Sequence, residues 1–311
     1  MIFHFILNPK SGGSSQQEKM EKDIADACAK RQLSYHIYYT TKPKDSITYV
    51  RDMINEYPDE RQRFICVGGD GTINEIANSA PNNPKIEFGV IPNGSGNDFV
   101  RNFTNRKFFT DINHQIDGEV QSFDLIKLND VYCVNMVNIG FDCAVVLEAN
   151  KFRKYKFIAP GLSYILGVIS GFFFRKLGTP MKIIFDNGQV IEKELSLTAI
   201  GNGKFCGGGF RSATKAILND GLLDICIIDK VTRLKFIQLI GCYKDGTYID
   251  KKSAMNVITY VQDSHFKMEF PEVQPICIDG EIFSADSVDF TVIPNAFNFV
   301  VPKGSDLKYK K

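Results

Sequence analysis

The sequence predicts an α/β domain with a parallel sheet, followed by an all-β domain with an antiparallel sheet. Three observations carry this prediction. Strand-like and helix-like segments alternate over the first 125 residues, and short β-like runs separated by turn residues dominate after them. The composition is also that of an ordinary globular protein, with 44% hydrophobic and 23% charged residues. A chain of 311 residues has room for two domains of common size.

The α/β domain is expected over residues 1–125. The segments read as strands are Ile2–Leu7, Tyr35–Thr40, Arg63–Val67 and Glu87–Ile91, and those read as helices are Gln16–Arg31, Ser46–Glu56 and a helix that starts at Ile73–Ala77. Strands and helices that alternate at this spacing predict parallel strands joined by right-handed crossovers. A sheet of this type binds its ligands outside the carboxyl ends of the strands.

The β domain is expected over residues 126–297. Turn residues such as Asp186-Asn187-Gly188 and Asp279-Gly280 separate its runs. Helical patches are expected only near Lys151–Arg175 and Arg233–Tyr243, and the end of the chain, 298–311, is a candidate to pack on the first domain, although Asn298–Pro302 suits either one. The β-like runs, the first of which joins the two domains, are Ser122–Leu128, Val131–Ile139, Met181–Phe185, Gln189–Ile200, Leu222–Ile228, Phe266–Phe270, Pro275–Ile278 and Val288–Ile293.

Charge and cysteine content narrow the class of protein. The net charge of +1 shows no basic excess, so nucleic acid is not an expected partner. The eight cysteines form no CxxC pair, and the N-terminus does not resemble a secretory signal. We therefore expect free, buried thiols and a cytoplasmic protein, in preference to disulfides or a zinc site.

One apolar stretch, Ala159–Phe174, raises the question of membrane contact. It is shorter than the roughly 20 residues that a spanning helix needs, and Pro160, Gly161, Gly167 and Gly171 interrupt it. Two interpretations stay open. The stretch is either a buried helix that packs within the protein or an interfacial element that touches a bilayer or a lipid tail.

Glycine-rich loops come after three of the predicted strands. The first, Asn8-Pro9-Lys10-Ser11-Gly12-Gly13, lies directly after Leu7. Such a loop either reverses the chain or presents backbone N–H groups to an anion at a helix start. This motif alone leaves both interpretations open.

The second loop lies in Val67-Gly68-Gly69-Asp70-Gly71-Thr72-Ile73-Asn74-Glu75, between a strand and a helix. Its glycines let backbone N–H groups approach phosphate oxygens without a Cβ in the way. Asp70 would repel a bare phosphate, so it indicates a cation, as when Mg²⁺ is held against ATP. The alternative is a tight turn in which Asp70 caps the helix. Three glycines around one Asp exceed what a cap requires, so we favour phosphate binding.

The third loop, in Ile91-Pro92-Asn93-Gly94-Ser95-Gly96-Asn97-Asp98-Phe99, repeats the pattern after another strand. In a parallel sheet the ends at Leu7, Val67 and Ile91 lie on the same edge. Three such loops together favour one anion-binding crevice over three independent turns. The first loop would then form one wall of a nucleotide-phosphate pocket, with Lys10 as counter-charge.

These residues resemble a known family. GGDGTINE followed by PNGSGNDF is similar to the diacylglycerol kinase catalytic domain, which sphingosine, ceramide and bacterial soluble lipid kinases share, whereas NAD kinases and phosphofructokinases share only the GGDG turn. Ile200–Gly203 with Gly207–Gly209, then Asn219–Asp224, then Asp279–Glu281 resemble the later family motifs in order. The resemblance implies a Rossmann-like, NAD kinase/phosphofructokinase-like domain followed by an antiparallel β-sandwich.

The resemblance also implies binding residues. Ser95 replaces the threonine of the family's GTxND motif and keeps its hydroxyl, so we expect binding to survive. A structural Mg²⁺ would be held by the carboxylate of Asp220 and the backbone carbonyls of Ile217 and Leu222, and carbonyl ligands do not depend on side-chain type. The residues expected to bind ATP are Asn8, Pro9, Lys10, Ser11, Gly12, Thr40, Gly68, Gly69, Asp70, Gly71, Thr72, Glu75 and Ser95.

Phosphorylation of an alcohol requires a carboxylate within hydrogen-bond reach of the hydroxyl. The resemblance assigns this role to Glu281, with Asp279 as the competing candidate. The residues alone favour a plain hairpin with Glu281 facing solvent, and the resemblance reverses that preference. Asp98 either orients the substrate hydroxyl or caps a helix. Asp124 matches a family position linked to the catalytic Mg²⁺ through water.

The function implied is an ATP- and Mg²⁺-dependent lipid kinase of phospholipid biosynthesis, with diacylglycerol as the expected acceptor and phosphatidic acid as the product. Its expected partners are ATP, a lipid at the inner face of the membrane and, by family analogy, a second copy in a homodimer. One rival is an NAD kinase-like phosphotransferase. The other is a non-catalytic lipid- or nucleotide-binding regulator, which should have lost a key carboxylate, whereas all the carboxylates named above are present.

Overall fold

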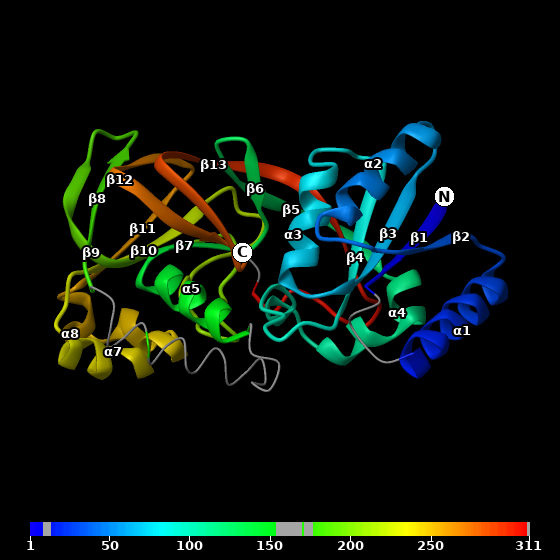
Figure 1. Ribbon diagram of the computed structural model, residues 1–311, viewed down its shortest axis with the longest axis horizontal. Helices are drawn as coiled ribbons and strands as arrows, with labels where there is room; N and C mark the ends of the chain where they lie inside the picture. The colour runs from blue at the N-terminus through cyan, green and yellow to red at the C-terminus, as the bar shows by residue number, and fades with distance from the viewer. Residues whose placement is uncertain (9–13, 154–169, 171–176, 310–311) are drawn as a thin grey trace. The chain divides into compact units, whose positions relative to one another are not determined.

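The computed structural model describes residues 1–8, 14–153, 170 and 177–309. The chain divides into two compact units, one of Met1–Leu125 with Pro294–Lys311 and the other of Ile126–Ile293 (Figure 1). Strands β5 (Glu119–Leu128) and β13 (Glu281–Val301) contribute residues to both units. Residues 9–13 of the first glycine loop, and all of the apolar Ala159–Phe174 stretch except Ser170, lie outside the described residues.

The first unit contains parallel strand pairs in the order β2-β1-β3-β4. The end of β13 adds a further parallel neighbour to β4, with Phe299 opposite Phe88. Phe299 is fully buried, and its ring lies 5.0 Å from that of Phe99. The segment Asn298–Pro302, which suited either domain, therefore pairs within the first unit. The strand bounds are Ile2–Leu7 for β1, Ser34–Tyr39 for β2, Gln62–Gly68 for β3 and Ile86–Pro92 for β4.

Helices cover both faces of these strands, α1 and α4 on one and α2 and α3 on the other (Figure 1). Alternate residues of the strands serve the two faces. Phe5 and Ile65 join a buried cluster with Ile24 of α1, whereas His4 stacks on Phe64 and its Nδ1 lies 3.0 Å from the Tyr49 hydroxyl of α2. The helices are α1 (Ser14–Arg31), α2 (Asp45–Glu56), α3 (Asp70–Ser79), η1 (Phe99–Asn102), η2 (Arg106–Thr110) and α4 (Ile112–Ile116).

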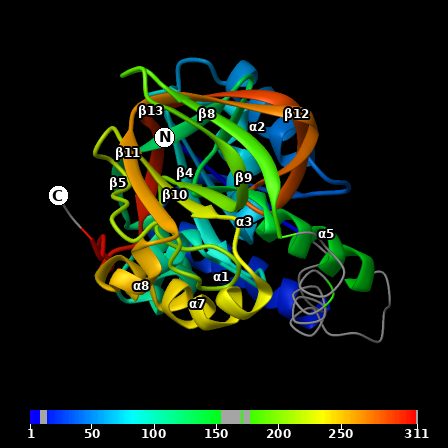
Figure 2. The same ribbon diagram turned by 90° about the vertical axis from the view of Figure 1, so that its left-hand side faces the viewer.

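The second unit contains antiparallel strand pairs in the order β11-β10-β9-β7-β12-β13, and β8 pairs with both β9 and β12. Its described helices lie on one side of the strands (Figure 2). The elements are β6 (Val131–Cys133), β7 (Met136–Gly140), α5 (Phe141–Arg153), β8 (Thr179–Phe185), β9 (Val190–Gly201), β10 (Leu223–Asp229), α7 (Arg233–Asp245), η3 (Thr247–Asp250), α8 (Lys252–Met255), β11 (Ile258–Asp263) and β12 (His265–Ile278).

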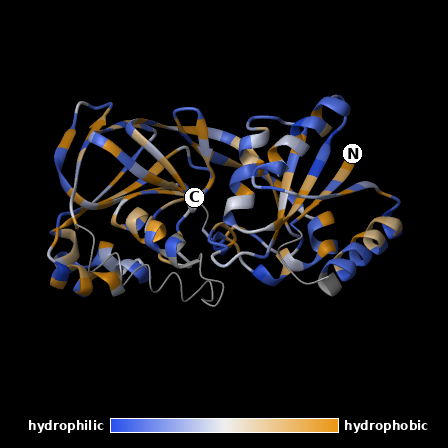
Figure 3. Ribbon diagram, in the orientation of Figure 1, coloured by the Kyte–Doolittle hydropathy of each residue, from blue (hydrophilic) through white to orange (hydrophobic). Residues whose placement is uncertain are grey.

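The strands of this unit separate two buried clusters. Val137, Ile139 and Ile276 belong to the cluster enclosed by strands. Ala199 and Cys226 belong to the cluster that α5 and α7 cover. Hydrophobic residues recur along the strands, whereas α1 of the other unit carries many hydrophilic ones (Figure 3). Among the helices that the structure describes, none has the length and hydropathy needed to span a membrane.

Several sequence expectations for this unit were wrong in detail. The run Val131–Ile139 is two strands, because the Asp279 carboxylate binds the backbone N–H groups between them. The runs Phe266–Phe270 and Pro275–Ile278 belong to one strand, β12, whose pairing with β13 shifts register in between. Helix α5 begins at Phe141, well before the expected helical patch. Strand β11, with mixed exposure, was not predicted.

All eight cysteines are free thiols, as expected. Seven are buried, and Cys206 is half-buried. Burial raises the pKa of Cys28 to about 11 and the pKa values of Cys226 and Cys277 to about 12. These thiols are therefore protonated at neutral pH and contribute chiefly to packing.

Candidate active site

The three glycine loops begin side by side. Leu7 pairs with Val67, and Val67 pairs with Ile91, so the three strands reach their carboxyl ends in register. Thr40 lies after β2 at the same edge, where its N–H donates to the Leu7 carbonyl at 3.0 Å. This confirms that the strand ends share one edge. Asn8 is exposed there, whereas Pro9, Lys10, Ser11 and Gly12 lie outside the described residues.

The second and third loops touch through their backbones. A Cβ added to Gly94 would lie 2.7 Å from the Cα of Gly69, and one added to Gly68 would lie 2.1 Å from the Thr72 Oγ1. The Asn93 N–H donates to the Gly68 carbonyl at 2.8 Å. Glycine is required here by close approach, so the two loops present a surface of backbone groups at the start of α3.

Asp70 links the same two loops. It is the first residue of α3, directly after the N-cap Gly69. Its Oδ1 accepts the Phe99 N–H at 3.1 Å. Gly69, and not Asp70, therefore occupies the N-cap position of α3. A Cβ on Gly96 would lie 3.0 Å from the Asp70 Oδ2 and 3.4 Å from the Asp98 Oδ2, so two carboxylates face this glycine.

Asp98 and Asp124 are both buried in the first unit. Asp98 precedes η1 without capping it, so the capping alternative is wrong here, and its Oδ1 lies 3.0 Å from the Arg101 Nε. The Oδ1 of Asp124, on β5, accepts the Asn295 N–H at 2.8 Å. Asp124 thereby ties β5 to β13.

The remaining loop residues differ in their roles. Glu75 accepts the Lys44 N–H at 2.9 Å and the Ser46 hydroxyl, so its carboxylate braces the start of α2. Gly71 and Thr72 lie half-buried in the first turn of α3, and Ser95 is exposed in the third loop. Both carboxylate oxygens of Glu75 thus accept hydrogen bonds from the start of α2 and the residue before it.

Asp279 and Glu281, two residues apart, have very different surroundings. The Asp279 carboxylate accepts the backbone N–H groups of Val134, Asn135 and Met136 at 2.8, 3.1 and 2.9 Å. Its φ is +47°, in the left-handed region. Glu281 is exposed at the start of β13, and it makes no hydrogen bond or ion pair with the residues that the structure describes. Of the two carboxylates, Glu281 is the available one.

Asp220 lies half-buried on the loop before β10. Its Oδ1 accepts the Leu222 N–H at 3.1 Å, and Ile217 is also half-buried. Carboxylate and carbonyl oxygens are donors that Mg²⁺ accepts, so this loop fits the ion chemically. In the described part of the chain no three His, Cys, Asp or Glu side chains gather to hold a metal. A site made of one carboxylate and two carbonyls does not require such a group.

A buried polar network lies near this loop. Asp224 is fully buried and accepts the Tyr260 hydroxyl at 2.6 Å and the Gln262 amide at 3.1 Å. Burial raises the pKa of Asp224 to about 6, against the effect of these hydrogen bonds. Burial lowers the pKa of Lys204, whose Nζ donates to the Thr214 carbonyl, to about 8. Sequence reasoning noticed only Asp224, as part of a motif, because the network joins separate strands and loops.

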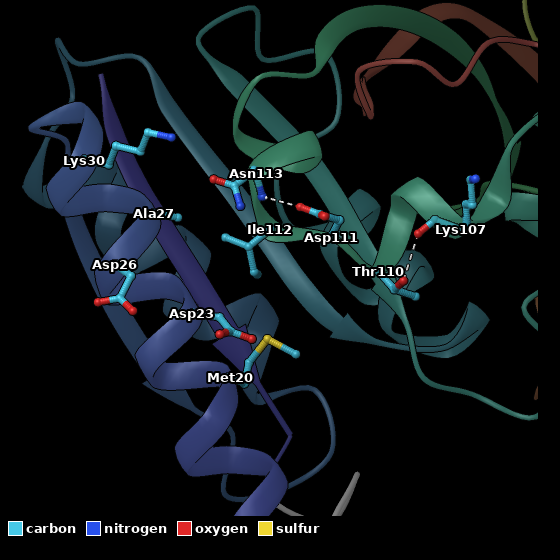
Figure 4. A pocket seen from close by; sticks show the side chains of 10 residues that line it. All are labelled: Met20, Asp23, Asp26, Ala27, Lys30, Lys107, Thr110, Asp111, Ile112 and Asn113. Atoms are coloured by element: carbon cyan, nitrogen blue, oxygen red, sulfur yellow. Dashed lines mark hydrogen bonds between the residues drawn. The ribbon is translucent and has the colours of Figure 1, made fainter.

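A groove of about 540 Å³ lies elsewhere in the first unit, between α1 and the η2–α4 segment (Figure 4). Asp23, Asp26 and Lys30 line its α1 side, and Lys107 and Asp111 line the other. Arg31 ties the same two elements together through Asp117, at 2.7 Å. None of the residues predicted for the functional site lines this groove.

Two family models match the chain in succession. Residues 3–128 match the diacylglycerol kinase catalytic domain. Residues 135–301 match the YegS C-terminal NAD kinase beta sandwich-like domain. The two matches together cover both units, and the second alone covers more than half of the chain.

The curated relatives carry consistent names. A "Probable lipid kinase YegS-like" from Shewanella frigidimarina is 26% identical over 267 residues, which cover 83% of this chain and 82% of that protein. A protein of the same name from Yersinia enterocolitica is also 26% identical, over 97% of both chains.

Solved structures share the fold. A Bacillus anthracis protein, described as a "putative diacylglycerol kinase", matches with a TM-score of 0.75 at 23% identity, covering 97% of this chain and 95% of that one. An NAD kinase from Archaeoglobus fulgidus in complex with ATP matches with a TM-score of 0.51 at 11% identity, covering 97% and 94%. The chain thus belongs to the family in which a diacylglycerol kinase catalytic domain precedes a YegS C-terminal domain, and its relatives are named lipid kinases.

Proposed function

We propose that this protein is an ATP- and Mg²⁺-dependent lipid kinase that phosphorylates a lipid hydroxyl, with diacylglycerol as the expected acceptor. The lipid oxygen forms a bond to the γ-phosphorus of ATP, the bond from that phosphorus to the bridging oxygen breaks, and ADP leaves. The hydroxyl proton passes to a carboxylate. Catalysis of this kind rests on positioning and on neutralising charge.

The observation that carries the proposal is the meeting of the glycine loops at one sheet edge. Gly69 of the second loop and Gly94 of the third touch through their backbones. Asp70 of the second loop also accepts the N–H of Phe99, at the end of the third. A surface of backbone groups at the N-terminus of a ten-residue helix suits phosphate oxygens. We assign ATP binding to this unit, through Asn8–Gly12, Thr40, Gly68–Thr72 and Ser95, with Glu75 as a positioning residue.

Glu281 is the proposed general base. Its carboxylate is exposed and makes no hydrogen bond with the described residues, whereas the Asp279 carboxylate already accepts three backbone N–H groups. A base must be able to reach the hydroxyl that it deprotonates. We therefore assign Asp279 a structural role, in which it holds the β6–β7 connection.

Mg²⁺ is proposed at two places. Asp220, Ile217 and Leu222 would hold a structural ion in the second unit through oxygen ligands. In the first unit, Asp70, Asp98 and Asp124 supply carboxylates around the ATP phosphates. When bound there, the ion would neutralise charge on the phosphates.

The acceptor determines the setting of the reaction. We propose a cytoplasmic protein that meets its lipid at the inner face of the membrane, with a second copy of itself as its partner in a homodimer. The second unit is proposed to supply the lipid site. The relatives' names support a lipid as the acceptor.

The test is transfer of label from γ-labelled ATP in the presence of Mg²⁺. The purified protein would receive diacylglycerol in mixed micelles, with ceramide, sphingosine, undecaprenol and NAD in parallel, and Asp70→Asn as the inactive control. Label in phosphatidic acid supports the proposal in full. Label in another lipid changes only the acceptor, and label in NADP would overturn the lipid assignment. ATP binding without transfer to any acceptor would favour the regulator.

A further inference from the structure

A row of residues crosses four adjacent strands of the second unit. Cys277 of β12 pairs with Asn138 of β7, which pairs with Ala199 of β9, which pairs with Cys226 of β10. Residues in one row of a sheet point to the same face. Ala199 and Cys226 belong to the cluster that includes Phe141 of α5, so the row faces this helix.

Asn138 is the polar member of that row, and its side chain has no hydrogen-bond partner among the residues that the structure describes. The residue is only 8% exposed, and its Oδ1 is fully buried without a hydrogen-bond donor. No hydrogen bond joins its side chain to the described residues. Buried side-chain amides are nearly always hydrogen-bonded, so an orphaned acceptor here points to a ligand that supplies a donor.

Asp142 lies in the first turn of α5, within electrostatic reach of two members of the row. Its side chain is half-buried and makes no hydrogen bond or ion pair with the described residues. Burial alone raises its pKa to about 6. The Asp142 charge also contributes, after burial, to the raised pKa values of Cys277 and Cys226. It therefore lies within electrostatic reach of both thiols, between which the row holds Asn138 and the small Ala199.

None of the described groups around Asp142 donates a hydrogen bond to it. From α7, the buried Tyr243 hydroxyl is a donor, but it bonds neither Asp142 nor any other described group. The thiols of Cys143, Cys226 and Cys277 are weak donors. Among the residues that the structure describes, no cation contributes to the raised pKa of Asp142. A carboxylate and an amide oxygen together favour an O–H or N–H group that enters from outside.

The same position is electrostatically close to the proposed base. Burial is the main cause of the raised pKa of Cys277, and the charges of Asp142, Asp279 and Glu281 raise it further, against a backbone hydrogen bond from Gly280. Asp142 and Glu281 thus both act on one buried thiol. A headgroup held by Asp142 would have its polar atoms near Glu281.

We propose that Asp142 and Asn138 bind an O–H or N–H donor of the lipid acceptor's headgroup and thereby set which lipid is accepted. This inference rests on the proposed function. The donor comes from one of two sources, either the hydroxyl that is phosphorylated or a second hydroxyl or amino group beside it. The acceptors in the test separate these two sources.

The experiment measures kcat and both KM values for wild type, Asp142→Asn and Asn138→Ala. The acceptors are dihexanoylglycerol, with one hydroxyl, monohexanoylglycerol, with two, and sphingosine, which adds an amino group. Glu148→Gln is the matched control, because Glu148 lies on the same helix, is also buried, and already pairs with Lys151 at 2.8 Å.

Asp142→Asn should raise the acceptor KM about 10- to 100-fold, which corresponds to the loss of one hydrogen bond to a charged group. The kcat and the KM for ATP should stay within about twofold. The lost hydrogen bond stabilises the bound lipid and the transition state equally, so its removal weakens lipid binding without slowing the chemical step. Asn138→Ala should raise the same KM about fivefold, the loss of a neutral hydrogen bond. A raised KM for all three acceptors would identify the reacting hydroxyl as the group that donates to Asp142. A raised KM for monohexanoylglycerol and sphingosine alone would identify the second hydroxyl or the amino group as that donor.

A purely structural Asp142 gives a different result. If Asp142 only supported α5, Asp142→Asn would lower the melting temperature and leave the acceptor KM unchanged, and this outcome overturns the inference. In the binding role, removing an unpaired half-buried charge leaves the melting temperature at pH 8 at least as high as that of wild type. Glu148→Gln should leave the acceptor KM unchanged.

A direct binding measurement separates this inference from the proposed function. The Asn138 side-chain amide would be followed by NMR in asparagine-labelled protein during titration with the same three lipids. A shift in wild type that is lost in Asp142→Asn supports the site even if no lipid is phosphorylated, in which case only the proposed function fails. The absence of any shift overturns the site, whatever the kinase assay shows.

Discussion

The two units place their polar residues in different ways. In the first unit, the loops that carry Asp70 and Asp98 come after strands whose ends at Val67 and Ile91 are in register. In the second, Asp279 reaches back to the backbone of Val134–Met136, far away in sequence. The comparison shows that a parallel sheet gathers the loops at the carboxyl ends of its strands, whereas an antiparallel unit depends on which strands become neighbours.

Asp70→Asn tests the loop-built side of this comparison and should have the largest effect. We expect turnover to fall at least about a thousandfold, the scale for loss of a group that stabilises the transition state. The free energy of unfolding should change by less than about 1 kcal/mol, because the Asn Oδ1 can still accept the Phe99 N–H. Steady-state kinetics and urea denaturation measure the two quantities. Turnover within tenfold of wild type would remove Asp70 from the phosphate site.

Asp279→Ala tests the strand-built side through stability. It leaves three backbone N–H groups without an acceptor and places Ala at a φ of +47°. We expect the free energy of unfolding to fall by about 3 kcal/mol. Asp279→Asn is the matched control, because Asn keeps one acceptor oxygen and tolerates this φ, so its loss should be smaller. Equal stability of wild type and Asp279→Ala would show that the carboxylate does not hold the β6–β7 connection.

Glu281→Gln separates catalysis from structure within the second unit. The residue is exposed and makes no hydrogen bond with the described residues, so denaturation should be unchanged. Turnover should fall about 100-fold, as expected for a general base, with the KM for ATP preserved. If Glu281→Gln remains active while a folded Asp279→Asn is inactive, the roles that we assign to the two carboxylates are reversed.

The smallest expected effect concerns His4, which should make the stability of the first unit depend on pH. Burial, with the charge of His36 in addition, lowers its pKa from 6.5 to about 4. Protonation therefore favours the unfolded chain, so the stability from a neutral His4 is complete above pH 6.5 and is lost as the pH falls toward 4. The loss between pH 6.5 and pH 5 should be about 2 kcal/mol. His4→Gln should remove this acid-side slope in urea denaturation, and an unchanged slope would exclude His4 as its source.

The sequence predicted what local pattern controls. Ile2–Leu7 is β1 to the residue, because an apolar run ends at Asn8 and Pro9. Val131–Ile139 was misread as one strand, because its break is imposed by Asp279 from the other end of the unit. Asp142 was not noticed, because an Asp in the first turn of a helix is ordinary. Its unusual feature is a half-buried carboxyl with a raised pKa, beside a row that four strands assemble.

The predictions for the functional site also depend on two kinds of information, the order of the strands and the contacts between distant residues. Strand order places the glycine loops on one edge, and the register of Leu7, Val67 and Ile91 bears this out. The choice between Asp279 and Glu281 required knowledge of which backbone groups each carboxylate meets. No periodicity in the sequence holds that information, since the donors lie at the β6–β7 connection, far from Asp279 in sequence.

The first unit is built from two separate stretches of the sequence, Met1–Leu125 and Pro294–Lys311, and this has a consequence during synthesis. The β4 neighbour that carries Phe299 is translated after the whole of the second unit. The first unit cannot complete its sheet until the whole of the second unit has been synthesised, so the second unit can complete its fold first. This reverses the usual N-terminal-first order. A premature stop codon after Ile293 would therefore spare every residue of the second unit and disable the first.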